Sequence, residues 1–394
     1  MKRFLFFFIL LANTIAAQTI TGTVVNENEK PLTEVSVYVD GSSISAITDA
    51  EGVFSIPLSK FRLGNLVIKK EGYETVIYPF KTDEIKKLKV VLTREAAIEE
   101  IKLLHYTDKI YNKYIQKFIN QFIGYDPNVK IKNQKDLIFA YDTPNKTLNA
   151  KAKKTLIIEN KNLGYILEYN LMSFSYNENL GMLTYTGTTF FKEMNGSEKQ
   201  KLDWKANRLN SFYGSPMHFF RSAYNNKVTD EGYIVNKIVK IQNPKYPTDE
   251  ELEKLNQYRE SLKKLKNNQP YLKTPDDIAD IQSRKFNQKK YLLALTESKI
   301  PQEKYIIYRD NKPYLSFENM LGIVYKKYPY TVDKGKIVKS EIPINTSSMI
   351  ETDGNIFEIS SDGNYSDPDL LIVQDDWANL RASNILPLDY NPEN

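Results

Sequence analysis

The side chains that most enzymes use for catalysis are scarce in this chain. Its 394 residues include no cysteine and only two histidines, His105 and His218. The absence of cysteine excludes disulfides, thiolate catalysis, iron–sulfur clusters and cysteine-ligated zinc. A zinc carboxypeptidase would need two histidines and a carboxylate on its metal, and His105-Tyr106-Thr107-Asp108 is the nearest approximation. We interpret His105 as a histidine on a helix surface and His218 as a core histidine within an aromatic cluster.

Serine and carboxylate chemistry finds equally little support. Gly214-Ser215-Pro216 matches only half of a Gly-x-Ser-x-Gly nucleophile elbow, and Pro216 is more typical of the first turn of a helix. The carboxylate pairs Asp276-Asp277 and Asp375-Asp376 are adjacent in sequence, so their members do not face each other across a substrate. A hydrolase would require Ser215 or His218 in an open pocket beside a carboxylate.

One acidic loop, Asp362-Gly363-Asn364-Tyr365-Ser366-Asp367-Pro368-Asp369, has oxygen ligands that could surround calcium. It lacks the spacing of glycine and final glutamate that an EF-hand has, and we interpret it as an acidic turn. The sequence contains no phosphate-binding glycine loop or dinucleotide fingerprint. We therefore predict no catalytic, cofactor-binding or metal-binding residue, and a protein that is not an enzyme.

Polar and aromatic residues gather between Arg208 and Tyr224, where the pattern predicts a helix. Tyr213, His218 and Arg221 lie among Phe212, Phe219 and Phe220 there. A helix this apolar is expected to be buried, and a buried arginine needs a carboxylate or several carbonyl groups to offset its desolvation. We predict that His218 and Arg221 form hydrogen bonds between this helix and a sheet.

The overall amino-acid composition of the chain is that of an ordinary globular protein. Hydrophobic residues make up 41% of the chain and charged residues 26%, which excludes disorder over most of its length and predicts two or three domains. The net charge of +5 comes from 54 basic and 49 acidic residues that are evenly mixed, which argues against nucleic-acid binding. Lysines interrupt nearly every candidate strand, which argues against a membrane β-barrel.

The first 17 residues have the pattern of a secretory signal peptide. Lys2 and Arg3 precede an apolar run over Phe4–Ala12, and small residues end at Ala17. The run is too short to span a membrane, and the absence of cysteine excludes a lipoprotein anchor. We predict a cleaved signal peptide at 1–17, export to the periplasm with the outer membrane or cell surface as further destinations, and no transmembrane span.

Residues 18–94 show short strand patterns separated by turn signals about every ten residues. This spacing predicts a β-sandwich. Gly22-Thr23-Val24, Lys30-Pro31-Leu32 before Val35–Val39, Thr48–Phe54 and Glu71-Gly72-Tyr73 follow one another in an order that resembles the carboxypeptidase regulatory-like domain. The resemblance implies a transthyretin-like, seven-stranded sandwich without an active site, of a kind abundant in exported proteins of Bacteroidetes-type bacteria, where it often precedes outer-membrane receptor plugs.

The rest of the chain is predicted to be a connecting amphipathic helix over 95–124 and a larger α+β domain over 125–394. The helix is expected to be continuous from 95 to 122 because apolar residues recur at helical spacing. Three later motifs, Ile158-Glu159-Asn160, Tyr213–Arg221 and Asn384–Tyr390, resemble the C-terminal region of stand-alone proteins that carry the same N-terminal domain. That resemblance implies no known activity.

We therefore predict an exported, non-catalytic accessory subunit that binds an outer-membrane or periplasmic protein, such as a receptor, transporter or assembly machine. The alternative is a glycan-binding protein, because transthyretin-like sandwiches resemble carbohydrate-binding folds and exposed coplanar aromatic residues would stack on sugars. A hydrolase is the third reading. The sequence predicts no cofactor and no nucleic-acid partner.

Overall fold

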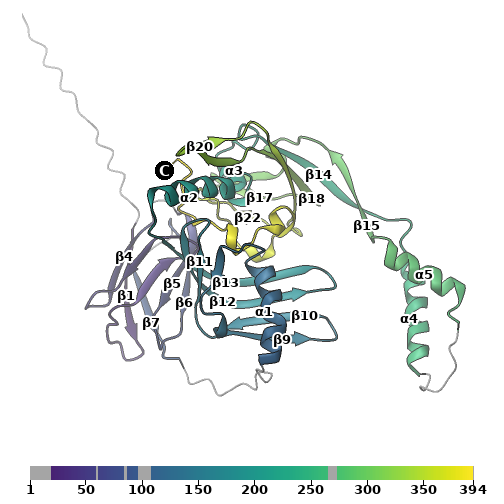
Figure 1. The fold of residues 1–394 in the computed structure, drawn as a ribbon, viewed down its shortest axis with the longest axis horizontal. Helices are drawn as coiled ribbons and strands as arrows, with labels where there is room; N and C mark the ends of the chain where they lie inside the picture. Colours follow the sequence, from purple (N-terminus) through teal and green to yellow (C-terminus); the bar gives the residue numbers. More distant parts are fainter. Residues whose placement is uncertain (1–18, 59–60, 84–86, 96–107, 265–272, 394) are drawn as a thin grey trace, which may run out of the picture.

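The computed structural model describes residues 19–58, 61–83, 87–95, 108–264, 273–393 (Figure 1). The predicted signal peptide and His105 lie outside these ranges, as does most of the predicted helix before residue 108. The described chain is mostly β-strand, with a sandwich followed by an α+β region. This confirms the predicted fold class.

The N-terminal sandwich has seven strands in two sheets. The order is β4-β1-β7 in one sheet and β3-β2-β5-β6 in the other. The strands are β1 (Thr19–Asn26), β2 (Ser36–Val39), β3 (Ser45–Ile47), β4 (Val53–Pro57), β5 (Leu63–Lys69), β6 (Val76–Lys81) and β7 (Leu88–Leu92). Alternate side chains of β1 and β4 enter the core, where Phe54 is almost fully buried. The sequence-predicted sandwich is confirmed.

Beyond the sandwich, helix α1 (Asp108–Phe122) is followed by another sheet, which we call the second sheet. Its order is β8-β11-β12-β10-β9, and β13 also pairs with β12. The strands are β8 (Val129–Ile131), β9 (Leu137–Asp142), β10 (Thr147–Ala152), β11 (Leu156–Asn160), β12 (Tyr165–Asn177) and β13 (Met182–Glu193). Phe118 and Phe122 of α1 are fully buried against this sheet, with the Phe118 ring 4.7 Å from that of Phe174. The amphipathic stripe therefore packs on a neighbour, as the pattern predicts.

Two corrections apply to this middle region. The sequence patterns over 182–186 and 188–192 predict two strands, but these residues form one strand, β13, which continues through Gly187. A Cβ atom at Gly187 would lie 2.4 Å from the Asn170 carbonyl oxygen, so the glycine permits a close approach between strands and does not end one. The predicted helix over 208–224 is two helices, α2 (Glu198–Phe212) and α3 (Pro216–Tyr224), because Gly214 adopts a φ of 83° between them.

A third sheet, with the order β15-β14-β18-β21-β23, builds a separate core. Its strands are β14 (Tyr233–Gln242), β15 (Tyr291–Glu297), β18 (Met320–Lys327), β21 (Ile344–Glu351) and β23 (Ile372–Asp375). Smaller sheets flank it, made of β16 (Ile306–Arg309), β17 (Lys312–Leu315) and β22 (Phe357–Glu358), and of β19 (Tyr330–Asp333) and β20 (Lys336–Lys339). Phe219, Phe220 and Trp377 pack into this core. The described residues after 125 thus contribute to two large hydrophobic clusters, one on each of these sheets.

An arm projects from the third sheet (Figure 1). Strand β18 pairs with β14 only over Tyr233–Ile238, so residues 239–242 and their partners 291–294 form a two-stranded ribbon beyond the sheet. Helices α4 (Asp249–Lys264) and α5 (Asp276–Asn287) lie at the tip and share a small core of their own around Leu255 and Ile281. The spacing of Thr248 and Glu251 in the sequence predicts a capping box, and the two residues form one at the start of α4. Helix α5 was not predicted from the sequence.

The C-terminal segment returns to the centre of the molecule, where it is yellow in Figure 1, and joins the parts. The Leu388 N–H donates to the Gly41 carbonyl of the sandwich, 2.8 Å away, and Asp389 accepts hydrogen bonds from Ser43. On the second sheet, Asn160 donates to the Ser383 carbonyl, also at 2.8 Å. This segment therefore fixes the sandwich against the rest of the chain.

Phe220 tests the core around α3. Its side chain is fully buried, and its ring centroid lies 4.6 Å from that of Tyr365. Phe220→Ala should lower the free energy of unfolding by about 3–5 kcal/mol, because it removes buried apolar area and leaves a cavity. Phe286 on α5 is 88% exposed, so Phe286→Ala should change it by less than about 0.5 kcal/mol. Urea denaturation followed by circular dichroism measures both, and equal effects would contradict the assignment.

Candidate functional site

The turn between α2 and α3 brings together the residues that the sequence singled out for chemistry. The Ser215 Oγ accepts a hydrogen bond from the His218 backbone N–H and caps α3, and Pro216 occupies the first turn. A Cβ atom at Gly214 would approach the Tyr325 ring to 2.8 Å, so glycine is required there for space as well as for φ. Ser215 therefore begins a helix, and its hydroxyl is engaged in capping.

The His218 imidazole is buried and held by three groups. Nδ1 lies 2.9 Å from the Tyr233 hydroxyl and accepts from the Gly214 N–H at 3.2 Å, while Nε2 lies 3.4 Å from a Glu231 carboxylate oxygen. Burial lowers the pKa of His218 to about 4, despite the opposing effect of Glu231. The ring is thus neutral at pH 7, with Nδ1 occupied as an acceptor and turned to Tyr233 rather than to the Ser215 hydroxyl. A carboxylate does lie beside His218, but this arrangement is not a Ser–His–Glu relay.

Arg221 binds three backbone carbonyl groups from two other segments. Nε donates to Asp362 at 2.9 Å, Nη1 to Tyr390 at 2.8 Å and Nη2 to Leu388 at 2.8 Å. Several carbonyl acceptors were one of the two predicted solutions for a buried arginine. His218 does contact a sheet strand through Tyr233, as predicted, whereas Arg221 contacts a turn and the C-terminal segment instead of a sheet.

A large cleft of about 1360 Å³ lies where the sandwich, the second sheet and the C-terminal loops meet. Its lining includes Phe80 and Lys81 from β6, residues 185–189 from β13, Ser215 from the start of α3, residues 363–369 and Trp377. Sequence reasoning missed this cleft, because its walls come from segments as far apart as Asp40 and Leu388 and no local pattern marks their meeting. Ser215 reaches it, but with no imidazole partner.

Buried carboxyl groups stand in and beside the cleft. Glu358 is 4% exposed and accepts from Lys81 at 3.1 Å, and its Oε1 lies 3.4 Å from Arg62 while accepting no hydrogen bond. Burial raises the pKa of Asp40 to about 6, although the Thr189 N–H donates to it. Burial likewise raises the pKa of Asp362 to about 6, and its Oδ2 has no hydrogen-bond partner among the described residues.

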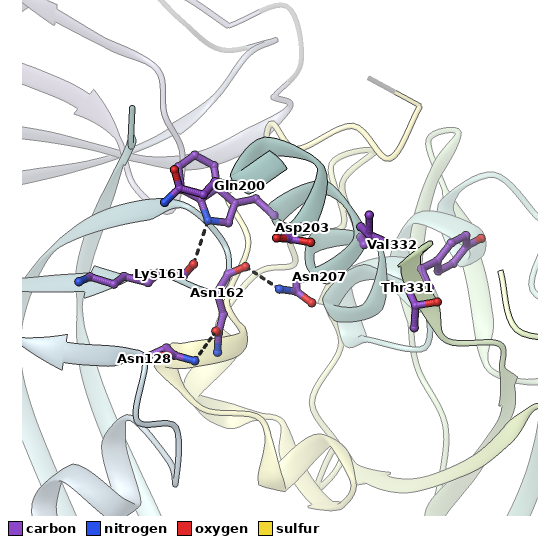
Figure 2. A pocket seen from close by; sticks show the side chains of 11 residues that line it. Asn128, Lys161, Asn162, Gln200, Asp203, Asn207, Thr331 and Val332 are labelled. Carbon is purple, nitrogen blue, oxygen red and sulfur yellow. Dashed lines mark hydrogen bonds between the residues drawn. The ribbon is translucent and has the colours of Figure 1, made fainter. Parts of the chain in front are cut away.

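A smaller pocket of about 480 Å³ lies between α2 and the β19 strand (Figure 2). Gln200, Asp203 and Asn207 come from α2, and Thr331 lies on the opposite side. Most of its polar groups are engaged: Asn207 donates to the Asn162 carbonyl, and the Trp204 Nε1 to the Lys161 carbonyl, both at 2.9 Å. These bonds tie α2 to the turn after β11, so we interpret the pocket as a structural junction.

The remaining sequence candidates do not converge on a site. Asp276 and Asp277 lie in the first turn of α5, where Asp277 pairs with Lys254, and Asp376 accepts from the Ser347 N–H. Within the described ranges, no group of three histidines or acidic residues could hold a metal ion. In the loop over 362–369, Asp362 Oδ1 accepts from the Asn364 N–H, in the manner of an acidic turn. Tyr78 is the one strongly exposed aromatic residue in the described sandwich, so no coplanar pair offers a sugar platform there.

The pH dependence of stability tests the buried Asp362. Its pKa is about 6 in the folded chain against 3.8 as the reference value, so the folded state binds more protons between these values and stability falls as pH rises through 6. The free energy of unfolding of the Asp362→Asn variant should therefore rise by roughly 2–3 kcal/mol relative to that of the wild type between pH 3.5 and pH 8. Unfolding of both proteins by urea at the two pH values measures this. His218 titrates in both proteins and cancels, and a pH-independent difference would contradict burial of an ionisable Asp362.

Comparison with known families bears on the N-terminal part. Residues 20–102 match the model of the CarboxypepD_reg-like domain, about a fifth of the chain. No curated protein matches the chain. The match begins one residue after β1 starts and covers all seven strands of the sandwich. The sandwich is therefore a CarboxypepD_reg-like domain, which is a regulatory and non-catalytic type of domain.

Proposed function

We propose that this protein is an exported, non-catalytic accessory subunit of the cell envelope that binds another protein through the arm formed by β14, α4, α5 and β15. Two features support the absence of catalysis: the non-catalytic type of the N-terminal domain, and the engagement of Ser215 and His218 in structural hydrogen bonds. Export rests on the signal-peptide pattern over 1–17. No helix in the described part of the chain is long and apolar enough to cross a membrane.

The observation that carries this proposal is the exposed apolar surface of the ribbon. Leu292 and Leu293 of the ribbon are 47% and 49% exposed, Leu295 directly beyond them on β15 is 62% exposed, and Ile241 on β14 is 50% exposed. Leu293 and Leu295 lie on one face of β15, and Leu292 and the paired Ile241 lie on the other. Apolar side chains therefore face solvent on both sides of the same strand.

An isolated ribbon of this kind is not expected to remain bare. Two-stranded hairpins are marginally stable in water, and exposed apolar edge strands are prone to pair with other chains. Strand β15 is the outermost strand of its sheet, and no described segment pairs with its free edge. Another protein would satisfy this edge by adding a strand to it and covering the leucine side chains. That partner would be an outer-membrane or periplasmic protein.

The test is affinity capture from detergent-solubilised outer membranes of the protein's own host. A Leu293→Lys/Leu295→Lys double variant places two charges on one face of the ribbon, and we expect it to reduce recovery of the wild-type partner more than tenfold. The matched control is Val338→Lys/Ile342→Lys, whose positions are 44% and 78% exposed in the β20 region. It should retain the partner.

Because all four positions are exposed, neither double variant should shift the unfolding midpoint appreciably, and a melting curve of each verifies this. Recovery of no partner above background by the wild type would count against an accessory subunit. Equal recovery by the ribbon variant and the control would show that the arm is not the docking element.

A further inference from the structure

We propose that the large cleft is a second binding site, which takes an extended peptide segment carrying basic residues along the open edge of β13. This inference does not depend on the arm, which lies on a different sheet. It rests on three features of the cleft: an unpaired strand edge, a facing apolar wall and carboxylates without a cation.

The free edge of β13 begins where a short pairing ends. The Gly41 N–H donates to the Thr189 carbonyl at 2.7 Å, and the Phe191 N–H donates to the Ser42 carbonyl at 3.0 Å. Thr189 and Phe191 therefore direct their backbone groups away from β12. Since this direction alternates along a strand, Gly187 and Tyr185 direct theirs the same way.

Both Gly187 and Tyr185 line the cleft, and no described strand pairs with β13 on that side before residue 190. Their N–H and C=O groups thus offer four hydrogen-bonding positions at the cleft wall. A peptide in β conformation satisfies such positions repeatedly, whereas a compact ligand meets only one or two of them. This is why we favour an extended polypeptide over a saccharide.

The other walls suit the side chains of such a peptide. Ile77, Pro79 and Phe80 from β6 face the cleft from the sandwich, and Met172 of β12, which is 50% exposed, lies on the side of the second sheet. Alternate residues of a strand would point to these two walls. Pro79 lacks an N–H group, so β6 is less suited than β13 to pair with the peptide.

The charge of the cleft favours a basic peptide. Its lining contains Asp40, Asp367 and Asp369, and no described cation forms an ion pair with any of the three. Of the two lining cations, Lys81 already pairs with Glu358, and Arg381 donates to the carbonyl groups of Ala378 and Leu380. Lysine or arginine side chains of a bound segment would therefore meet uncompensated negative charge.

The experiment uses the full chain and a fluorescein-labelled octapeptide of alternating valine and threonine with a lysine at each end. Binding is followed by fluorescence anisotropy, beside a peptide with glutamates in place of the lysines and one with proline at its centre. We expect the lysine peptide to bind at least tenfold more tightly than either. Asp367→Asn/Asp369→Asn should weaken it about three- to tenfold. Asp333→Asn/Asp353→Asn, which removes the same charge from exposed positions outside the cleft, should not.

Because the chain lacks cysteine, position can be tested directly. Thr186→Cys in the cleft should form a disulfide with a cysteine-containing lysine peptide, whereas the exposed Ile342→Cys should not. Equal trapping at both positions, or equal binding of the lysine and glutamate peptides, would overturn the proposal. A third result would also overturn it: if cellotriose, but not the peptide, protected the Thr186→Cys side chain from an alkylating reagent, the cleft would be assigned to a saccharide. The Leu293→Lys/Leu295→Lys variant should bind the peptide normally, so failure of the arm and failure of the cleft are distinguishable.

Discussion

The arrangement of the molecule depends on one guanidinium group. Among the described residues no carboxylate is hydrogen-bonded to Arg221, and its burial is offset instead by the carbonyl groups of Asp362, Leu388 and Tyr390. Hydrogen bonds from a charged donor stabilise by about 1.5–3 kcal/mol each, and the planar fork of arginine can serve several acceptors at once. The three donors of a lysine share one nitrogen, whereas these carbonyls are reached by three separate nitrogens of the guanidinium group. Through these bonds α3, a loop of the third sheet and the C-terminal segment meet at fixed positions.

This junction also determines where the cleft lies and why its chemistry is polar. Residues within 377–388 form part of the cleft wall, and the same segment ends at Leu388, whose carbonyl accepts a hydrogen bond from Arg221. Asp362 is buried beside the same guanidinium, which partly offsets the effect of burial on its pKa. The loop that follows it supplies the carboxylates of Asp367 and Asp369. The cleft is thus a gap between units that are tied at one end, and it remains open where polar side chains and an unpaired strand edge face each other.

Local patterns in the sequence were sufficient for much of the fold. The alternation in β1 and β4 reflects burial on one face of each strand, and the stripe of α1 reflects its packing through Phe118 and Phe122. Prediction was weaker where tertiary space decides. Gly187 looked like a strand end, and only the approach of Asn170 explains it; Gly214 divides a helix because Tyr325 lies against it. The carbonyl ligands of Arg221 could be predicted as a type but not by position, since backbone groups leave no mark in the sequence.

The position of the C-terminal segment has a consequence for the order of folding. The Gly41 carbonyl of the sandwich accepts from the N–H of Leu388, and Arg221 donates to the carbonyls of Leu388 and Tyr390. These hydrogen bonds therefore join residues that are roughly 170 to 350 positions apart in the sequence. Contacts of this separation form slowly, because closing long loops is entropically costly. During synthesis the sandwich can already pair with β13 through Gly41 and Ser42, but the hydrogen bonds of Leu388 and Asp389 to the sandwich form only when the last few residues have emerged. A chain built in this way completes the junction around Arg221 only at the very end of its translation.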